Sequence, residues 1–298
     1  MIVHIGFHKT ATTWLQNSIF PFIKDVNYLG ISSLINNTEA WVSEFRRELP
    51  QKINLEKIRK EISIAERKSI LLLSDERFSG GMLTGAGAID YADRISNVSS
   101  DPKVIICIRN QVDMWESIYR QYVNEGGDKS FNNFFKEEGL GSDFFYLGNL
   151  EYSNLISYYF EKLGRSNVLV LAYEELLNDK REFLGKILNF IESKDNGIYA
   201  ISNQKVDNKS IGYYETILLR FLNPFMKTGI SPGPVYFPDS RYLKWLLRKI
   251  PIKSKKKFTD VYLSEIETRY SADNERLKKI IPELDIEKYG YVCNEGTE

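Results

Sequence analysis

The sequence predicts an α/β protein, a three-layer fold in which helices flank a mostly parallel central sheet. Two observations predict this class. Short apolar runs typical of buried strands recur along the chain, and segments with the apolar spacing of amphipathic helices separate them. Strands that alternate with helices favour a parallel sheet covered on both faces. The clear strand signals are residues 2–5, 69–74, 103–110 and 167–173.

The first sixteen residues combine a strand, a polar loop and the start of a helix. Residues 2–5 predict a buried strand, Gly6 ends it, and residues 12–20 predict a helix that stops at Pro21. A loop of this kind gathers unpaired backbone N–H groups and the positive end of a helix dipole, which favours anion binding. The alternative is an ordinary turn whose threonines cap the helix. The donor side chains in the loop are Lys9, Thr10, Thr12 and Thr13.

The rest of the first two hundred residues continues the alternation. Glycines between residues 80 and 87 predict a flexible loop, and Asn110, with Asp113 as its partner, is expected to cap the helix that follows the third clear strand. The segment 131–145 is rich in aromatic and acidic residues and has no clear pattern. A short strand is expected at 27–32, and further helices at 38–49, 54–67, 150–163 and 181–191.

Composition limits the function classes. The chain has 298 residues, of which 43% are hydrophobic and 27% charged, as in soluble globular proteins. We expect a single domain over 1–298, with a core at 1–200 and a mainly helical extension at 201–298. Forty basic residues balance forty acidic ones, so overall charge does not favour nucleic acid binding. The sequence shows no secretion signal and no apolar run of membrane-spanning length, and Cys107 and Cys293 do not predict a disulfide framework, so a cytoplasmic location is expected.

Three charged side chains each follow a predicted strand. They are Lys9, Glu76 and Arg109. Because ligands of parallel sheets bind beyond the carboxyl ends of the strands, we expect these three side chains to face one crevice. Ser117 lies about two helical turns along the helix that follows Arg109. A guanidinium group, which can donate two parallel hydrogen bonds, together with a hydroxyl suits a second, separate phosphate.

The loop differs from the nucleotide-triphosphate P-loop, which needs a Gly-Lys pair before its Ser or Thr. Lys9 stands three residues after Gly6, and no Gly-Lys pair precedes the threonines. An ATP-dependent kinase or ATPase nevertheless stays open as an alternative, because residues 71–76 (LLLSDE) are typical of a strand whose Asp holds magnesium.

The sequence resembles the sulfotransferase family, which uses 3′-phosphoadenosine-5′-phosphosulfate (PAPS) as donor. The family motif P-K-S-G-T-T-W-L is similar to residues 8–15 (HKTATTWL), and its Arg followed eight residues later by Ser is similar to Arg109 and Ser117. The segment 167–191, with Tyr173-Glu174-Glu175, resembles a later strand and helix of the family. The resemblance implies a P-loop-like nucleotide-binding core and no metal.

The resemblance also implies a role for each matched residue. Lys9 would stabilise the leaving phosphate, Trp14 would stack on adenine, and Arg109 with Ser117 would hold the 3′-phosphate. Two positions depart from the motif, because His8 replaces Pro and Ala11 replaces Gly. Close backbone approach at Ala11 requires an unstrained conformation there. The implied donor-binding set is His8, Lys9, Thr10, Ala11, Thr12, Thr13, Trp14, Arg109 and Ser117.

The acceptor hydroxyl must lose a proton, so a general base is needed. In the polysaccharide branch of the family a glutamate after the preceding strand takes this role, and Glu76-Arg77 resembles that pair. Asp75 is the other candidate for the general base. In the alternative, Glu76 has no catalytic role and only pairs with Arg77 or another nearby cation. His8 is expected to act as a second donor in the anion loop, and His4 as a packed core residue.

The acceptor is expected to be a saccharide or glycolipid, an inference from Glu76 and from the aromatic content, which suits stacking on sugar faces. A non-catalytic glycan-binding relative is a further alternative, against which Lys9 and Glu76 argue. Residues 241–257 hold eight basic residues and no acid, interleaved with aromatic and apolar ones. This run suits either peripheral contact with a membrane or a solvated helix.

Overall fold

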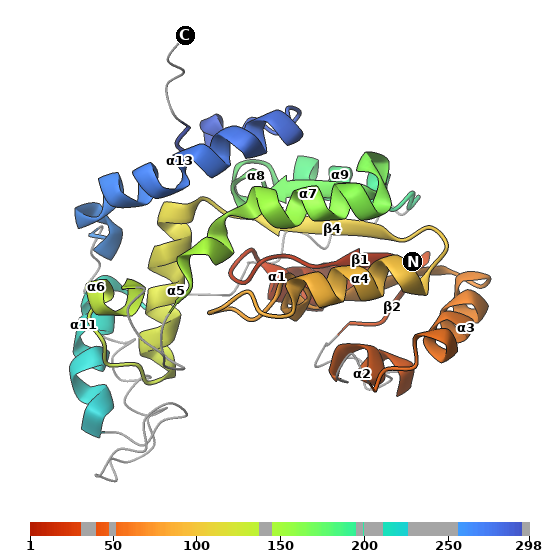
Figure 1. Cartoon of the computed structure of the whole chain (residues 1–298), viewed down its shortest axis with the longest axis horizontal. Coiled ribbons are helices and arrows are strands. Elements are labelled where there is room, and N and C mark those ends of the chain that lie inside the picture. Colours follow the sequence, from red (N-terminus) through yellow and green to blue (C-terminus); the bar gives the residue numbers. More distant parts are fainter. Residues whose placement is uncertain are drawn as a thin grey trace. The chain divides into compact units, whose positions relative to one another are not determined.

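Five strands form one parallel sheet in the order β2-β3-β1-β4-β5 (Figure 1). The computed structural model describes residues 1–30, 40–47, 52–136, 145–194, 199, 211–225 and 256–293. The sheet confirms the predicted three-layer α/β class with a parallel sheet. Its strands are β1 (Ile2–His4), β2 (Val26–Tyr28), β3 (Ile70–Ser74), β4 (Lys103–Ile108) and β5 (Val168–Ala172).

The described residues fall into two compact units. The first comprises 1–110, 149–207 and 271–298, and the second 111–148 and 208–270. The single-domain organisation over 1–298 stays a prediction. Helices of the first unit are α1 (Thr12–Trp14), α2 (Ala40–Arg47), α3 (Leu55–Glu66), α4 (Ala88–Val98), α7 (Tyr152–Leu163), α8 (Tyr173–Asn178) and α9 (Lys180–Phe190). Those of the second are α5 (Gln111–Glu125), α6 (Phe131–Phe135) and α11 (Tyr213–Leu222), and α13 (Leu263–Ile280) runs through both.

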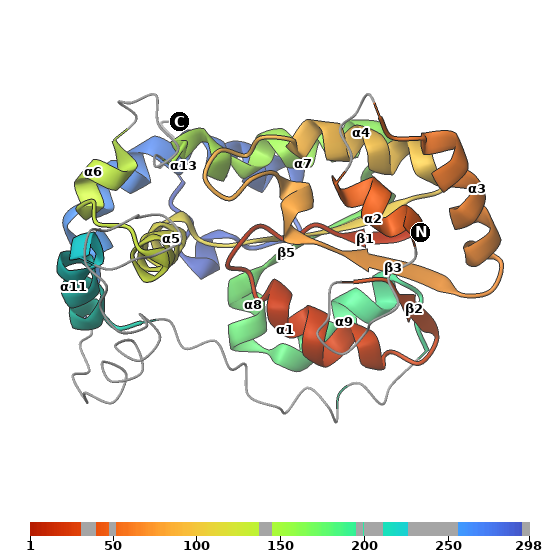
Figure 2. The same ribbon diagram turned by 90° about the horizontal axis from the view of Figure 1, so that it is seen from below.

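The central position of β1 follows from its pairing. Val3 pairs with Leu73 of β3 on one side and with Val104 of β4 on the other. All three strands are almost entirely buried, as expected for a parallel sheet covered on both faces. In Figure 2, α1, α8 and α9 lie on one face of the sheet, and α2, α4 and α7 lie on the other.

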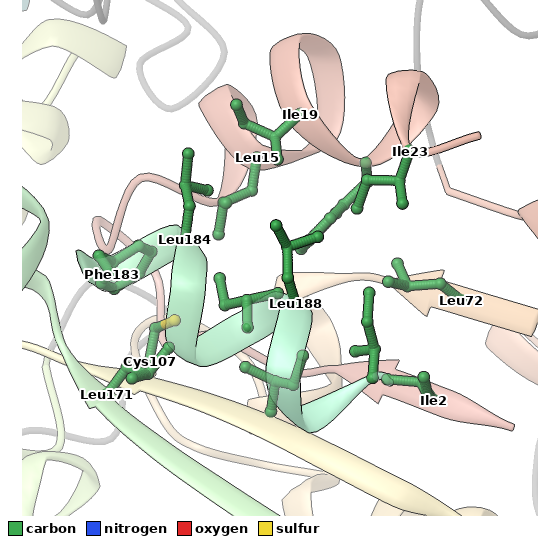
Figure 3. Packing of buried hydrophobic residues seen from close by; sticks show 14 of the residues in the cluster. Ile2, Leu15, Ile19, Ile23, Leu72, Cys107, Leu171, Phe183, Leu184 and Leu188 are labelled. Atoms are coloured by element: carbon green, nitrogen blue, oxygen red, sulfur yellow. The ribbon is translucent and has the colours of Figure 1, made fainter. Parts of the chain in front are cut away.

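The core beneath the first face joins the N-terminal helix to α9. Leu15 and Ile19 face Leu184 and Leu188 of α9 above the strand residues Leu72 and Cys107 (Figure 3). Each of these side chains is at most 5% exposed. Burial of one such aliphatic side chain contributes roughly 1.5–3 kcal/mol, so this cluster fixes the start of the N-terminal helix against the sheet.

Some element bounds differ from the predicted ones. The helix expected over 12–20 contains a π-helical stretch at Leu15–Ile19 and continues as a 3₁₀ turn at Phe20–Phe22. Proline is tolerated in the first turn of that 3₁₀ segment, so Pro21 does not stop the helix. The short strand expected at 27–32 begins one residue earlier, as β2. Helix α4 follows the glycine-rich loop directly and was not predicted.

His4 is a packed core residue, as predicted. Its side chain is fully buried, and its Nδ1 lies 2.8 Å from the Ser74 hydroxyl oxygen on β3. Burial lowers the pKa of His4 to about 3, because an apolar surrounding disfavours the charged imidazolium. The ring is therefore neutral and belongs to the sheet core.

The second unit contains an aromatic core between α5 and α6. The rings of Trp115 and Phe135 stack with centroids 4.1 Å apart, and those of Tyr122 and Phe134 with centroids 4.3 Å apart. The buried Glu116 carboxylate accepts the backbone N–H of Phe258 at 2.8 Å. The first part of the segment 131–145 is thus a helix that packs on α5. Among the helices that the structure describes, none is long and apolar enough to span a membrane.

Candidate donor-binding and catalytic site

The loop between β1 and α1 contains two unusual backbone conformations. Lys9 has φ 68° and Ala11 has φ 62°, both in the left-handed region. This region is uncommon for residues other than glycine, and such strain gathers at functional sites. The unstrained conformation that close approach at Ala11 was expected to require is therefore absent at this residue. The family's glycine fits this backbone without strain.

Ala11→Gly is expected to stabilise the protein by about 1 kcal/mol, because relief of left-handed strain exceeds the added entropy of the unfolded chain. Urea denaturation measures this difference in the free energy of unfolding, and the slope of that free energy against urea concentration is expected to be unchanged. Ala65→Gly in α3, where the backbone is helical, is the matched control and is expected to destabilise by a similar amount. A loss of stability in Ala11→Gly would contradict the strain argument.

Donor groups converge where this loop enters the helix. The Trp14 N–H makes the first backbone hydrogen bond of the helix, to the Ala11 carbonyl at 3.0 Å. The backbone N–H groups before Trp14 have no partner within the helix and can therefore bind a ligand. The buried Thr12 hydroxyl has no hydrogen-bond partner within the described part of the chain. Thr13 is exposed. The Thr10 hydroxyl is fully buried and donates to the Phe7 carbonyl at 2.5 Å, so its hydrogen is already used within the loop.

Arg109 lies directly beside this loop. One of its guanidinium nitrogens donates to the Lys9 carbonyl at 3.1 Å, and the group lies 4.7 Å from the centroid of the Tyr173 ring. The Tyr152 hydroxyl donates to the Arg109 carbonyl at 2.7 Å. The buried Nε of Arg109 has no partner among the residues that the structure describes. The guanidinium is thus held in place with a donor still available.

Glu76 begins the short 3₁₀ turn η3 (Glu76–Ser79) that follows β3. Its carboxylate Oε1 lies 3.9 Å from Nδ1 of His8, and Nε2 of the same ring lies 3.2 Å from the Gly80 carbonyl. The Glu76 side chain is 38% exposed. The loop between β1 and α1 therefore contacts both the Glu76 turn and Arg109, so the segments that follow β1, β3 and β4 lie together. That the side chains of Lys9, Glu76 and Arg109 face one crevice stays a prediction.

Asp75 is buried and doubly paired. Its Oδ2 lies 3.2 Å from Nε of Arg46 on α2 and 2.6 Å from a guanidinium nitrogen of Arg77. Its side chain is 3% exposed, and its Oδ1 caps η3 by accepting the Arg77 N–H at 3.0 Å. The hydrogen bond to Asp75 is the main cause that raises the pKa of Arg77. Arg77 therefore pairs with Asp75, whereas Glu76 faces His8.

Comparison with known proteins finds one matching family and several similar structures. Residues 92–213 match the sulfotransferase domain family, a family of enzymes. A sulfotransferase of known crystal structure from Alicyclobacillus acidocaldarius is similar over 97% of this chain and 97% of its own, with 18% identity and a TM-score of 0.54. The chain has the sulfotransferase fold.

Other similar structures are more distant. Mouse sulfotransferase SULT7A1, crystallised as a complex with PAP, has 13% identity over 95% of this chain and 88% of its own, with a TM-score of 0.44. The sulfotransferase domain from the curacin biosynthetic pathway has 11% identity over 94% and 97%, with a TM-score of 0.41. No curated protein matches this chain.

The side chains of two residues of the implied donor-binding set, Trp14 and Ser117, are not part of the loop contacts described above. Trp14 is 3% exposed and belongs to the core cluster, and the Lys180 ammonium lies 5.5 Å from its ring centroid. The Trp14 ring is therefore covered by the protein itself, and its stacking on adenine stays a prediction. Ser117 is half-buried on α5 and belongs to the second unit, whereas Arg109 belongs to the first. Their joint contact with one phosphate stays a prediction.

Residues that support the site were missed in the sequence. Arg46 holds Asp75 from α2, and no local pattern distinguishes it from other helical arginines. Glu174 accepts the Asn110 N–H at 3.0 Å and fixes the chain just after Arg109. The Asn110 side-chain amide donates to the carbonyls of Tyr289 and Gly290, so this residue fastens the segment around them. Its expected role as the cap of α5 stays a prediction.

Proposed function

We propose that this protein transfers a sulfuryl group from PAPS to an acceptor hydroxyl. The observation that carries the proposal is that one anion loop contacts both the Arg109 guanidinium and the Glu76 turn at the carboxyl edge of the sheet. A two-phosphate nucleotide fits the donor groups there, because the Thr12 hydroxyl and the Arg109 Nε are buried without partners among the described residues. The family match of residues 92–213 supports the same reaction.

The residues divide the chemistry between them. The loop N–H groups and the Lys9 ammonium stabilise negative charge that develops on the departing phosphate, so this step does not need a metal ion. Glu76 takes the acceptor's proton while the acceptor oxygen forms its bond to sulfur and the bridging S–O bond breaks in line. Thr10 to Thr13 hold the 5′-phosphate, and Arg109 with Ser117 holds the 3′-phosphate.

The kinase alternative is disfavoured by the surroundings of Asp75. Its carboxylate would have to bind magnesium in a P-loop enzyme, but Arg46 and Arg77 already occupy its oxygens. The same pairs disfavour Asp75 as the general base. Glu76, which is partly exposed beside the anion loop, is the better candidate for that role.

The acceptor we propose is a saccharide or glycolipid. For the basic run at 241–257 we propose peripheral contact with a membrane, with a solvated helix as the alternative. Residues 241–255 of the basic run at 241–257 lie outside the described residues. The last α-helix that the structure describes before this run, α11, carries an exposed apolar stripe that suits such contact. The stripe consists of Tyr214, Leu218, Phe221 and, just beyond the helix, Phe225, which are between 41% and 61% exposed.

The reaction itself is tested with radiolabelled PAPS and a panel of sugars and glycolipids. Transfer of label that survives EDTA supports sulfuryl transfer, whereas magnesium-dependent ATP turnover in place of transfer would support the kinase alternative. A Lys9→Ala variant that binds adenosine 3′,5′-bisphosphate but does not transfer label would exclude a purely non-catalytic binder.

The donor site is tested by titration with adenosine 3′,5′-bisphosphate. Arg109→Ala is expected to weaken binding at least tenfold, about 1.4 kcal/mol, because a guanidinium in contact with the loop is lost. Arg165→Ala is the matched control, since Arg165 also lies over an aromatic ring, Phe160, at 4.4 Å but precedes β5 at the other end of the sheet. Equal affinity of Arg109→Ala and wild type would contradict the assignment.

A further inference from the structure

His8 stands where the sulfotransferase motif has proline, and its ring makes two contacts that a proline cannot make. Nε2 lies 3.2 Å from the Gly80 carbonyl oxygen. Because a carbonyl oxygen only accepts, Nε2 carries the hydrogen and donates it. Nδ1 is then the remaining nitrogen, and it lies 3.9 Å from Oε1 of Glu76. The His8 side chain is 17% exposed, so the ring is largely enclosed.

The turn that receives the ring is itself fixed. The Asp75 carboxylate caps its start, the Ser79 hydroxyl donates to the Glu76 carbonyl at 2.7 Å, and Gly80 has φ 95°. A Cβ on Gly80 would lie 2.2 Å from the Gly85 carbonyl oxygen, so the loop closes tightly behind it. The imidazole is therefore anchored through Nε2 to the backbone of this turn, and Nδ1 faces the Glu76 carboxylate.

We propose that His8 is a positioning residue for Glu76: the ring is fixed by Gly80 and, as the imidazolium, in which Nδ1 also carries a hydrogen, pairs with the carboxylate through Nδ1–H. It thereby holds the Glu76 side chain at the edge of the donor loop. This inference rests on the proposed function, because it assigns His8 a role through the general base. Within the described residues, Glu76 is the ionisable side chain that the structure places in ion-pair range of the ring.

Two variants separate the contacts of the ring. His8→Gln keeps an N–H near the position of Nε2 and loses the nitrogen that faces Glu76, whereas His8→Asn keeps an N–H near the position of Nδ1 and loses the Gly80 contact. We expect His8→Gln to lower kcat about tenfold with an unchanged KM for PAPS. His8→Asn is expected to recover part of this loss.

A double-mutant cycle with Glu76→Gln decides whether His8 acts through Glu76. We expect His8→Gln to have no further effect on kcat in the Glu76→Gln background. An undiminished tenfold effect there, or wild-type kcat in His8→Gln, would overturn the proposal. If Glu76→Gln alone transfers sulfate at the normal rate, the assigned base fails instead, and that result is distinct from failure at His8. Binding of adenosine 3′,5′-bisphosphate by each variant verifies that the loop is folded.

Discussion

Glu76→Gln is expected to lower kcat for sulfuryl transfer by about 10²–10⁴-fold, the usual contribution of a general base. The amide keeps the shape of the side chain but cannot accept the acceptor's proton. Because Glu76 lies on the η3 turn and the assigned phosphate-binding groups lie on other segments, affinity for adenosine 3′,5′-bisphosphate is expected to stay close to that of wild type. Steady-state transfer of label from PAPS and calorimetric titration measure the two quantities.

The control for this substitution is Glu61→Gln on α3, where the side chain is exposed and away from the carboxyl edge of the sheet. This variant is expected to retain wild-type kcat. If Glu76→Gln behaves in the same way, Glu76 is not the base. A large loss of nucleotide affinity in Glu76→Gln would show instead that the carboxylate shapes the donor site.

Asp75→Asn is expected to lower the free energy of unfolding by about 3–5 kcal/mol, because it leaves the Arg46 charge buried without its carboxylate. The Arg46 side chain is only 4% exposed, and it also donates to the carbonyls of Leu29 and Ser74 at 3.2 Å. These neutral acceptors do not balance the lost negative charge. Urea denaturation followed by circular dichroism measures the change.

An exposed ion pair provides the contrast. Lys278 and Glu287 lie 2.8 Å apart with side chains about half exposed, so Glu287→Gln is expected to cost less than about 1 kcal/mol. Equal stability losses in Asp75→Asn and Glu287→Gln would mean that burial adds nothing at Asp75. The comparison therefore isolates the effect of removing the charge pair from water.

The sheet and the proximity of the segments that follow β1, β3 and β4 could be predicted because both follow from simple regularities. Apolar runs mark β1, β3, β4 and β5, and parallel strands bring their carboxyl ends to one edge. Lys9, Glu76 and Arg109 each follow such a run directly. The proximity of these segments needed no knowledge of side-chain packing.

Other features depend on contacts between distant segments or on backbone angles. Arg46 is 29 positions before Asp75, and no periodicity in the sequence links the two. The left-handed Ala11 could not be predicted, since alanine ordinarily avoids that conformation. Helix α4 was missed because the glycines before it indicate a loop, although Gly87 with φ 88° directly precedes the helix.

The place of β1 between β3 and β4 determines how long β1 waits for its neighbours during synthesis. Ile2 is aligned with Leu72 and Lys103, so its two neighbours are made 70 and 101 residues later. At ordinary translation rates the ribosome needs about 5–20 s to reach the second of them. During this interval nascent β1 has no permanent neighbour on at least one side, and unpaired apolar strands associate readily with other chains. Shielding by a chaperone during synthesis would therefore matter most before the fourth strand emerges.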